Sequence, residues 1–428
     1  MHWLAPRGML GLGLALAFGV AAAASERGGA VPPPPRPAPA DLVRLHPDLP
    51  ADFRDWLRAF HPRAVAAGIA EATLARALPT IRHRSDVIGL DRNQAEFTRQ
   101  IWDYLDTAVS EARVAEGRAQ RTRHLGTLRA IEARYGVPPA IVLAIWGMET
   151  NFGGYRGRTH ILSALATLAH EGRRGAFFEA ELIAALRIIE AGDANPATMR
   201  GSWAGAMGHT QFMPTSYLAY AVDFGGDGRR DVWSEDPTDA LASTAAFLAA
   251  EGWTAGEPWG FEVVLPEDFD FEGTGRGRRA GVELWMSRGV RMPSGGPLPD
   301  HGPAAIITPA GARGPAFIAY RNFDVIARYN RALSYMVAVG HLADRIEGRG
   351  PLGRGWPRGE PALTAADRRA LQEELKRTGF DPGDIDGRIG PATTDALRDW
   401  QRAQGLIADG FPTRAILESL RKAPPCQC

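Results

Sequence analysis

Apolar residues recur at helical spacing through most of this chain. Phe53, Leu57 and Phe60 share one helical face, and Ile101, Tyr104 and Leu105 repeat the pattern. Further helical blocks cover residues 161–189, 237–250 and 323–346, and such stripes are typical of core packing. The pattern therefore predicts a mainly α-helical protein.

The pattern changes between residues 257 and 323. Proline, glycine and charged residues separate short alternating runs at 261–265 and 304–308. Such runs predict short strands. We expect a small β-containing insertion within the helical domain.

Residues 141–154 form an almost uninterrupted apolar segment that carries one carboxylate, Glu149. Pro138 and Pro139 suit a helix start, residues 140–148 are apolar on every face, and Gly153-Gly154 suits the helix stop. Burial and the negative end of the helix dipole should raise the pKa of Glu149, as a general acid requires. The alternative is a structural carboxylate that reaches solvent or caps a neighbouring helix.

A glycine-rich stretch at residues 201–216 lies between the predicted helices. Its glycines would let the backbone approach a ligand closely, and its polar groups could orient that ligand. The alternative is a turn whose polar groups satisfy one another. The residues concerned are Gly201, Gly205 and Gly208, with Ser202, His209, Thr210 and Gln211.

Composition narrows the range of functions. The 428 residues carry 49 basic and 49 acidic side chains, so nothing in the charge favours nucleic acid as a partner. The two cysteines, Cys426 and Cys428, stand at the end of the chain, where we expect tail residues without structural weight.

The first 24 residues combine a basic start, a short apolar run and small residues, which is typical of a secretory signal peptide. An uncleaved membrane anchor is the alternative, although the run is short for a span. No cysteine follows it to carry a lipid. We expect a periplasmic protein without a stable membrane span in its mature form.

Composition also suggests domain boundaries. We expect a signal peptide at 1–24, a proline-rich linker at 25–51, a catalytic domain at 52–347, a linker at 348–361, a small C-terminal domain at 362–422 and a tail at 423–428.

Three signatures occur in one order: Glu149-Thr-Asn-Phe-Gly153, the stretch 201–216, and Arg328-Tyr-Asn330 through Tyr335. Together they resemble the membrane-bound lytic transglycosylase B family of bacterial peptidoglycan enzymes. The resemblance implies a lysozyme-like catalytic domain that binds glycan strands and requires no cofactor. Other cell-wall enzymes are further candidate partners.

The resemblance also implies a reaction. Glu149 would first protonate the glycosidic oxygen between N-acetylmuramic acid and N-acetylglucosamine and then deprotonate the muramic acid C6 hydroxyl, giving a 1,6-anhydro sugar. Neither the Glu149 segment nor the glycine-rich stretch 201–216 supplies an obvious second carboxylate, which hydrolytic glycosidases usually need. A hydrolytic muramidase and an inactive peptidoglycan-binding protein are the alternatives.

The resemblance assigns cleft positions residue by residue. Two departures remove polar contacts: Ala332 stands where Ser is common, and Ala246-Phe247 where Asn-Tyr is common. The residues expected to bind substrate are Ser202, Met207, Gln211, Phe212, Tyr329, Asn330 and Tyr335.

The segment 223–234 looks like a calcium loop. Asp223, Asp227 and Asp231 stand at positions 1, 5 and 9, but Gly225 and Ser234 occupy positions 3 and 12, where ligands are normal. Some relatives complete a matching loop with the acid corresponding to Asp239. The sequence leaves open a weak structural calcium site formed by Asp223, Asp227 and Asp239, or a turn held by side-chain to backbone bonds.

Residues 363–420 resemble the small three-helix peptidoglycan-binding domain of many wall enzymes. The pairs Asp386-Gly387 and Gly390-Pro391 are typical of turns between helices. Such a domain would raise the local concentration of the enzyme at the wall.

Overall fold

The computed structural model describes residues 44–92 and 99–426. The expected signal peptide, most of the proline-rich linker and Cys428 lie outside these residues. Within the described ranges, no helix is long and apolar enough to cross a membrane.

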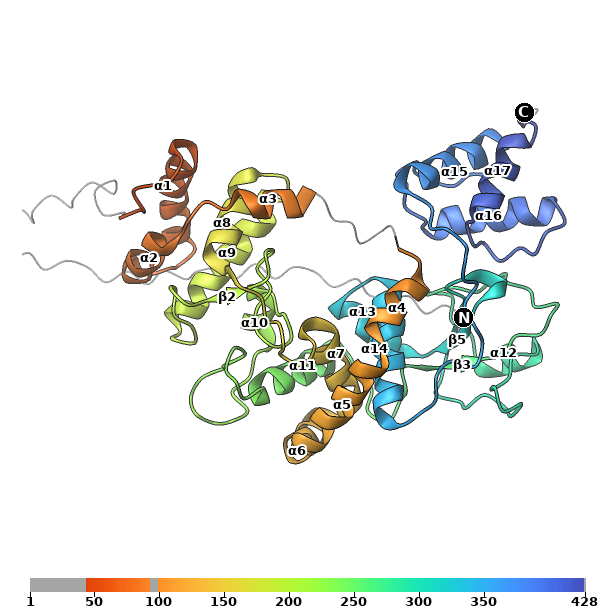
Figure 1. The fold of residues 1–428 in the computed structure, drawn as a ribbon, viewed down its shortest axis with the longest axis horizontal. Coiled ribbons are helices and arrows are strands. Elements are labelled where there is room, and N and C mark those ends of the chain that lie inside the picture. The colour runs from red at the N-terminus through yellow and green to blue at the C-terminus, as the bar shows by residue number, and fades with distance from the viewer. Residues whose placement is uncertain (1–43, 93–98, 427–428) are drawn as a thin grey trace, which may run out of the picture. The chain divides into compact units, whose positions relative to one another are not determined.

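Helices dominate the described chain, as the sequence predicts (Figure 1). The first group is α1 (Ala51–Ala66), α2 (Glu71–Ala77), α3 (Ser85–Arg92), α4 (Ile101–Ala108), α5 (Glu111–Arg123), α6 (Leu125–Tyr135) and α7 (Pro139–Thr150). The second group is α8 (Ile161–Glu171), α9 (Gly175–Glu190), α10 (Pro214–Tyr220), α11 (Thr238–Ala250), α12 (Val282–Ser287), α13 (Arg321–Tyr329) and α14 (Leu333–Glu347). The last group is α15 (Ala365–Arg377), α16 (Pro391–Ala403) and α17 (Arg414–Lys422).

Two long helical blocks expected from the sequence are each divided in two. The block at 161–189 breaks where Gly172 ends α8 in the left-handed region. The block at 323–346 breaks at Asn330, whose side chain accepts the backbone N–H of Ala332. A helical spacing of apolar residues survives such a break, so periodicity alone does not reveal it.

The strands form two small antiparallel sheets. β1 (Thr159–His160) pairs with β2 (Arg200–Gly201). β3 (Gly260–Val263), β4 (Ala305–Ile307) and β5 (Ala316–Ala319) form a second sheet in the order β3-β5-β4. The two predicted runs become β3 and β4, while the central strand β5 was not predicted.

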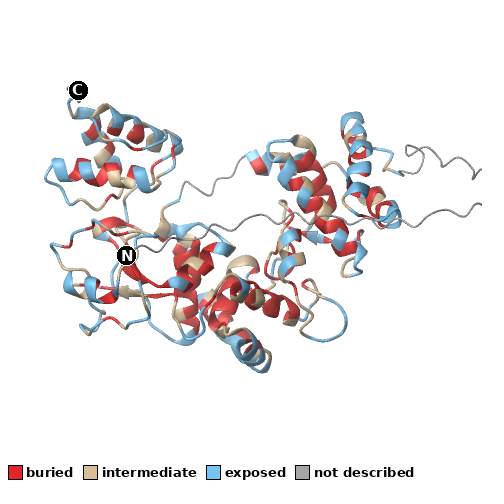
Figure 2. Cartoon of the chain, turned by 180° about the vertical axis from the view of Figure 1, so that it is seen from behind, coloured by how far each residue is buried: buried red, intermediate tan, exposed pale blue. Residues whose placement is uncertain are grey.

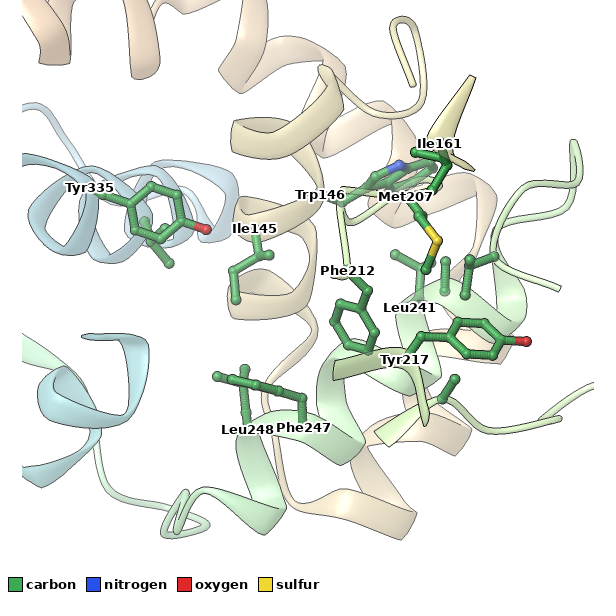
Figure 3. Close-up of a cluster of buried hydrophobic side chains, with 14 of the residues drawn as sticks. Ile145, Trp146, Ile161, Met207, Phe212, Tyr217, Leu241, Phe247, Leu248 and Tyr335 are labelled. Carbon is green, nitrogen blue, oxygen red and sulfur yellow. The ribbon is translucent and has the colours of Figure 1, made fainter. Parts of the chain in front are cut away.

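The main core lies around α7, whose residues Ala140 to Gly147 are all buried. α14 packs along α7, and α5 and α11 also contact it. Figure 3 shows Ile145 and Trp146 of α7 among the surrounding buried side chains, with Phe247 and Leu248 of α11 and Tyr335 of α14. This packing holds the end of α7 within a rigid frame.

Helices α15 to α17 have a core of their own, built on Leu371, Leu397, Trp400 and Leu417. Each of these helices is buried on one side and exposed on the other (Figure 2). The buried Gln372 accepts the backbone N–H of Gly387 and donates to the carbonyl of Arg388. The Asp386-Gly387 turn is therefore structural.

One hydrogen bond connects the end of the described chain to α15. The backbone N–H of Cys426, an exposed residue, donates to the carbonyl of Arg377 at 3.0 Å. The expectation of a tail without structural weight stays a prediction.

Candidate active site

Glu149 is the penultimate residue of α7, at the carboxyl end of this helix. The helix ends at Thr150, with Asn151 in the left-handed region at φ 51°, rather than at Gly153-Gly154. Asn reaches this region more easily than most residues. Phe152 also has a positive φ, 57°, and its ring occupies the space beside Gly147, where a Cβ would lie 2.7 Å from the ring. Such strain persists only where packing enforces it.

Glu149 keeps part of its surface accessible while protein atoms surround its carboxyl. Burial raises the pKa of Glu149 from 4.5 to about 7, and a hydrogen bond from Tyr335 partly opposes this rise in pKa. The upward shift expected from the sequence is confirmed. Near neutral pH, a substantial fraction of this carboxyl is protonated and can donate a proton.

Tyr335 donates its hydroxyl to Oε1 of Glu149 at 2.7 Å. The pKa of Tyr335 lies well above 10 because its ring is buried and the carboxylate lies beside it. Tyr329 donates to the carbonyl of Thr210 at 2.5 Å, and the charge of Glu149 also raises its pKa. Both tyrosines therefore remain hydrogen-bond donors close to Glu149.

Thr150 fastens the helix end to the glycine-rich stretch. Its hydroxyl donates to the carbonyl of His209 at 2.6 Å and accepts the backbone N–H of Gly153 at 3.0 Å. Trp146 donates to Nδ1 of His209 at 3.1 Å. Because an indole N–H can only donate, this nitrogen of His209 is unprotonated. Burial lowers the pKa of His209, which agrees with a neutral ring.

The glycine-rich stretch forms a tight hairpin in which Met207 and Phe212 exchange backbone hydrogen bonds of 2.8 and 3.0 Å. Both side chains are buried and lie beside the α7 and α11 residues in Figure 3. The ring centroids of Phe212 and Tyr329 are 6.0 Å apart, and those of Phe247 and Tyr329 are 5.1 Å apart. These residues form an apolar wall near Glu149.

The glycines of the stretch are required for packing. A Cβ at Gly201 would lie 2.1 Å from the carbonyl oxygen of Ala206, and one at Gly208 would lie 2.2 Å from that of Val232. At Gly205 the collision would be with Leu165, at 2.4 Å. The expectation that the backbone of this stretch approaches a ligand closely stays a prediction.

The remaining expected binding residues make local hydrogen bonds. The Ser202 hydroxyl accepts the backbone N–H of Ala206, and the Gln211 amide donates to the carbonyls of Gly208 and Arg156. Asn330 is exposed and caps Ala332. The structure links Tyr335 directly to Glu149, but it records no contact of Ser202, Gln211 or Asn330 with that carboxyl.

Other acidic residues that could have folded toward Glu149 are engaged elsewhere. Glu171 pairs with Arg92 and Glu179 with Arg63. Glu181 accepts the backbone N–H and hydroxyl of Thr215. Among the described residues, no second carboxylate contributes to the pKa shift of Glu149.

The aspartates of the expected calcium loop bind backbone amides. Asp223 accepts three backbone N–H groups, from Gly226 to Gly228, and Asp227 accepts that of Arg229. Asp239 accepts three more, from Phe224, Gly225 and Asp231. No group of three or more His, Cys, Asp or Glu in the described part of the chain could hold a metal ion. These hydrogen bonds shape the loop, and the calcium site expected from the sequence stays a prediction.

Two residues near the site were not selected from the sequence. Thr150 belongs to the Glu149 signature, and its position next to the acid is the feature of the sequence that could have identified it. Tyr104 is close enough to Tyr335 to raise that residue's pKa. Its hydroxyl within an apolar helical stripe was the available clue.

Comparisons with known proteins agree with this geometry. Residues 52–344 match the family described as transglycosylase SLT domain, and residues 364–420 match the putative peptidoglycan binding domain. The chain is 36% identical over 214 residues to membrane-bound lytic murein transglycosylase B of Escherichia coli K12. That match covers 50% of this chain and 58% of the relative, so it spans little more than half of the relative's length.

The chain is also similar to solved structures of lytic transglycosylases. The chain is similar to SltB3 of Pseudomonas aeruginosa in complex with NAG-anhNAM-pentapeptide, with a TM-score of 0.84 and 46% identity over 87% of this chain and all of that one. It is also similar to Slt35 of Escherichia coli in complex with calcium, with a TM-score of 0.59 and 28% identity over 72% of this chain and 98% of that one.

Proposed function

The chain belongs to the transglycosylase SLT domain family, and from this premise we propose that it is a lytic transglycosylase of peptidoglycan in which Glu149 is the acid and then the base. Its substrate would be the β-1,4 bond between N-acetylmuramic acid and N-acetylglucosamine. The observation that carries the proposal is a carboxyl with a pKa of about 7 whose hydrogen-bond partner is a buried tyrosine hydroxyl.

The reaction needs one proton carrier. Protonated Glu149 donates its proton to the glycosidic oxygen as the bond from the muramic acid C1 to that oxygen breaks. The resulting carboxylate faces the positive charge at C1 and takes the proton of the C6 hydroxyl of the same sugar. O6 then bonds to C1, which gives the 1,6-anhydro ring and returns Glu149 to its protonated form without consuming water.

Tyr335 opposes part of the effect of burial on this carboxyl. Its hydroxyl donates to Glu149 and favours the carboxylate, which offsets part of the effect of burial on the pKa. A pKa near 7 suits a group that must give and then accept a proton at neutral pH. We therefore assign Tyr335 as the residue that orients and tunes Glu149.

We propose that the remaining expected residues shape the cleft. Met207 and Phe212, which are buried, would support its apolar side from behind, and the half-buried Tyr329 would present a surface to the sugar. Ser202, Gln211 and Asn330 would reach the N-acetyl and hydroxyl groups of the strand, with Ser202 and Gln211 half-buried and Asn330 exposed.

The other parts of the chain fit action at the wall. We propose export to the periplasm through the signal peptide at residues 1–24, and retention at peptidoglycan by helices α15 to α17. The Asp223 loop would then be a structural element held by its own backbone bonds.

Product analysis tests the proposal against hydrolysis. Purified sacculi digested by the mature protein should yield muropeptides that end in 1,6-anhydro-muramic acid, detected by mass spectrometry. Reducing muramic acid ends without the anhydro form would show a muramidase instead. Glu149→Gln should release neither product, and binding without any release by the unaltered protein would point to an inactive wall-binding protein.

A further inference from the structure

A polar pocket lies beside the end of α7, and neither Met207 nor Phe212 lines it. It has a volume of about 440 Å³, and its lining comes from the start of α5 and from the turn after Glu149. The lining residues are Ser110, Ala112, Arg113, Glu116, Asn151, Phe152 and Gly154. Nothing in the reaction described above uses this pocket.

Arg113 is the charged donor of the pocket and has no anionic partner. Its Nε donates to Oδ1 of Asn151 at 3.3 Å, and its Nη1 donates to the carbonyls of Thr107 and Ala108 at 3.0 and 2.9 Å. Within the described ranges, its Nη2 has no hydrogen-bond partner and no carboxylate forms an ion pair with it. These three contacts to neutral oxygens fix the guanidinium and leave Nη2 free to donate.

Burial lowers the pKa of Arg113, which means that the protein has taken this cation partly out of water without supplying a counter-charge. An unpaired, partly desolvated guanidinium gains more from an incoming anion than an exposed one does. Because Nε and Nη1 already donate to protein oxygens, Nη2 is the nitrogen that can give a charge-assisted hydrogen bond to a carboxylate.

Neighbouring groups suit the same ligand. The side-chain amide N–H groups of Asn151 have no partner among the described residues, and its Oδ1 accepts from Arg113, so its NH₂ group is available to donate to a carboxylate. Glu116 also lines the pocket, but its Oε1 accepts from Gln120, and Glu116 is not among the groups that shift the pKa of Arg113.

The lining of the pocket is close to Glu149 along the chain and shares a neighbour with its partner Tyr335. Asn151 follows Glu149 by two residues, and Tyr104 is close enough to influence the pKa values of both Arg113 and Tyr335. In peptidoglycan the peptide stem hangs from N-acetylmuramic acid, the sugar whose bond Glu149 would break. A carboxylate on that stem is thus the anion that the substrate brings closest to this pocket.

We propose that the Arg113 pocket binds a carboxylate of the peptide stem and so selects muramic acid residues that carry a stem. The proposal rests on the proposed function, because it assumes a strand bound with its muramic acid at Glu149. It assigns Arg113 and Asn151 to substrate specificity rather than to proton transfer.

The test compares two substrates with one variant. Arg113→Met is assayed on glycan strands that carry stems and on strands from which an amidase has removed them, and anhydro ends are counted. We expect kcat/KM to fall on the order of tenfold on stem-bearing strands, the scale of one charge-assisted hydrogen bond, and to stay unchanged on stem-free strands. Arg121→Met, at an exposed position on the same helix, is the control and should change neither value.

The ratio of the two kcat/KM values separates specificity from stability. Loss of the bonds to Thr107 and Ala108 could lower the folded fraction, but that lowers both values equally. An unchanged ratio would overturn the proposal, and a wild-type protein that makes no anhydro ends would instead overturn the proposed function. Calorimetric titration with NAG-anhNAM-pentapeptide needs no turnover: we expect about tenfold weaker binding to Arg113→Met, and equal affinity would overturn the proposal.

Discussion

Replacing Glu149 by Gln should remove activity and, at alkaline pH, stabilise the protein. Gln has nearly the same shape, and its Oε1 can still accept the hydroxyl of Tyr335 at the position that Glu149 uses. The substitution removes the acidic proton of the protonated carboxyl and the poorly solvated negative charge of the carboxylate. Loss of the general acid should lower the rate by at least about 10³-fold, near the upper part of the usual range for such groups.

The size of the stability effect follows from the pKa. The pKa of Glu149 is raised from 4.5 in the unfolded chain to about 7 in the folded protein. Between these values the folded state holds the proton more tightly, so stability falls as pH rises and the whole penalty is present above pH 7. At about 1.4 kcal/mol per pH unit, the upper limit is about 3 kcal/mol, and partial exposure of Glu149 reduces this to about 1–3 kcal/mol.

The assay is thermal or urea unfolding of wild type and Glu149→Gln at two pH values. At pH 8 the variant should be more stable, with Tm higher by a few degrees, on the scale of about 2–4 °C per kcal/mol. Near pH 4.5, where the carboxyl is protonated in the folded state and about half protonated in the unfolded chain, the difference should nearly vanish. Glu132→Gln is the matched control at an exposed position and should show no pH-dependent difference.

Two results would refute the reasoning. One is an equal stability difference at both pH values, which would mean that Glu149 is not desolvated. The other is a wild-type kcat/KM that already falls above pH 4.5 instead of above about pH 7. An active Glu149→Gln variant would remove the residue from the mechanism altogether.

Three further outcomes test other contacts. Tyr335→Phe deletes the hydroxyl that favours the carboxylate, so the alkaline limb of kcat/KM should move to higher pH while the rate at pH 6 falls about tenfold; an unmoved limb would contradict the tuning role. Asp239→Ala leaves three backbone amides without an acceptor and should cost about 2–3 kcal/mol in urea unfolding, and 1 mM calcium should shift the wild-type Tm by less than about 1 °C; a larger rise would support the calcium hypothesis. Burial raises the pKa of Asp344 to about 7, so Asp344→Asn should stabilise the protein at pH 8 and not at pH 4; destabilisation at pH 8 would show that its ion pair with Arg349 dominates.

Local patterns in the sequence predicted the parts of this fold that depend on local interactions. The fully apolar segment before Glu149 predicted a buried helix and a raised pKa, because both follow from the residues that flank the carboxylate. The same patterns did not predict the strand β5 or the breaks at Gly172 and Asn330. Pairing partners and chain reversals depend on distant residues, whose positions a local pattern does not contain.

In the site, too, local sequence predicted some features, while contacts between distant residues required the structure. Tyr335 lies 186 positions after Glu149, and only the resemblance to a known family connected them before the structure recorded their hydrogen bond. Residue type alone did not show that the missing Cβ atoms of the glycine-rich stretch make room for the protein's own backbone and for Leu165. The aspartates of the expected calcium loop likewise satisfy nearby amides, a use of carboxylates that spacing does not distinguish from metal binding.

The end of α7 combines hydrogen bonds that do not titrate at neutral pH with a carboxyl that does. Thr150 and Trp146 tie the helix end to His209 through neutral hydrogen bonds, so titration at neutral pH need not disturb its position. Glu149, one residue away, has a pKa of about 7 and can change its protonation state. A site that cycles one proton through one carboxyl needs this combination, because a frame that titrated together with the acid would move it between the two proton transfers.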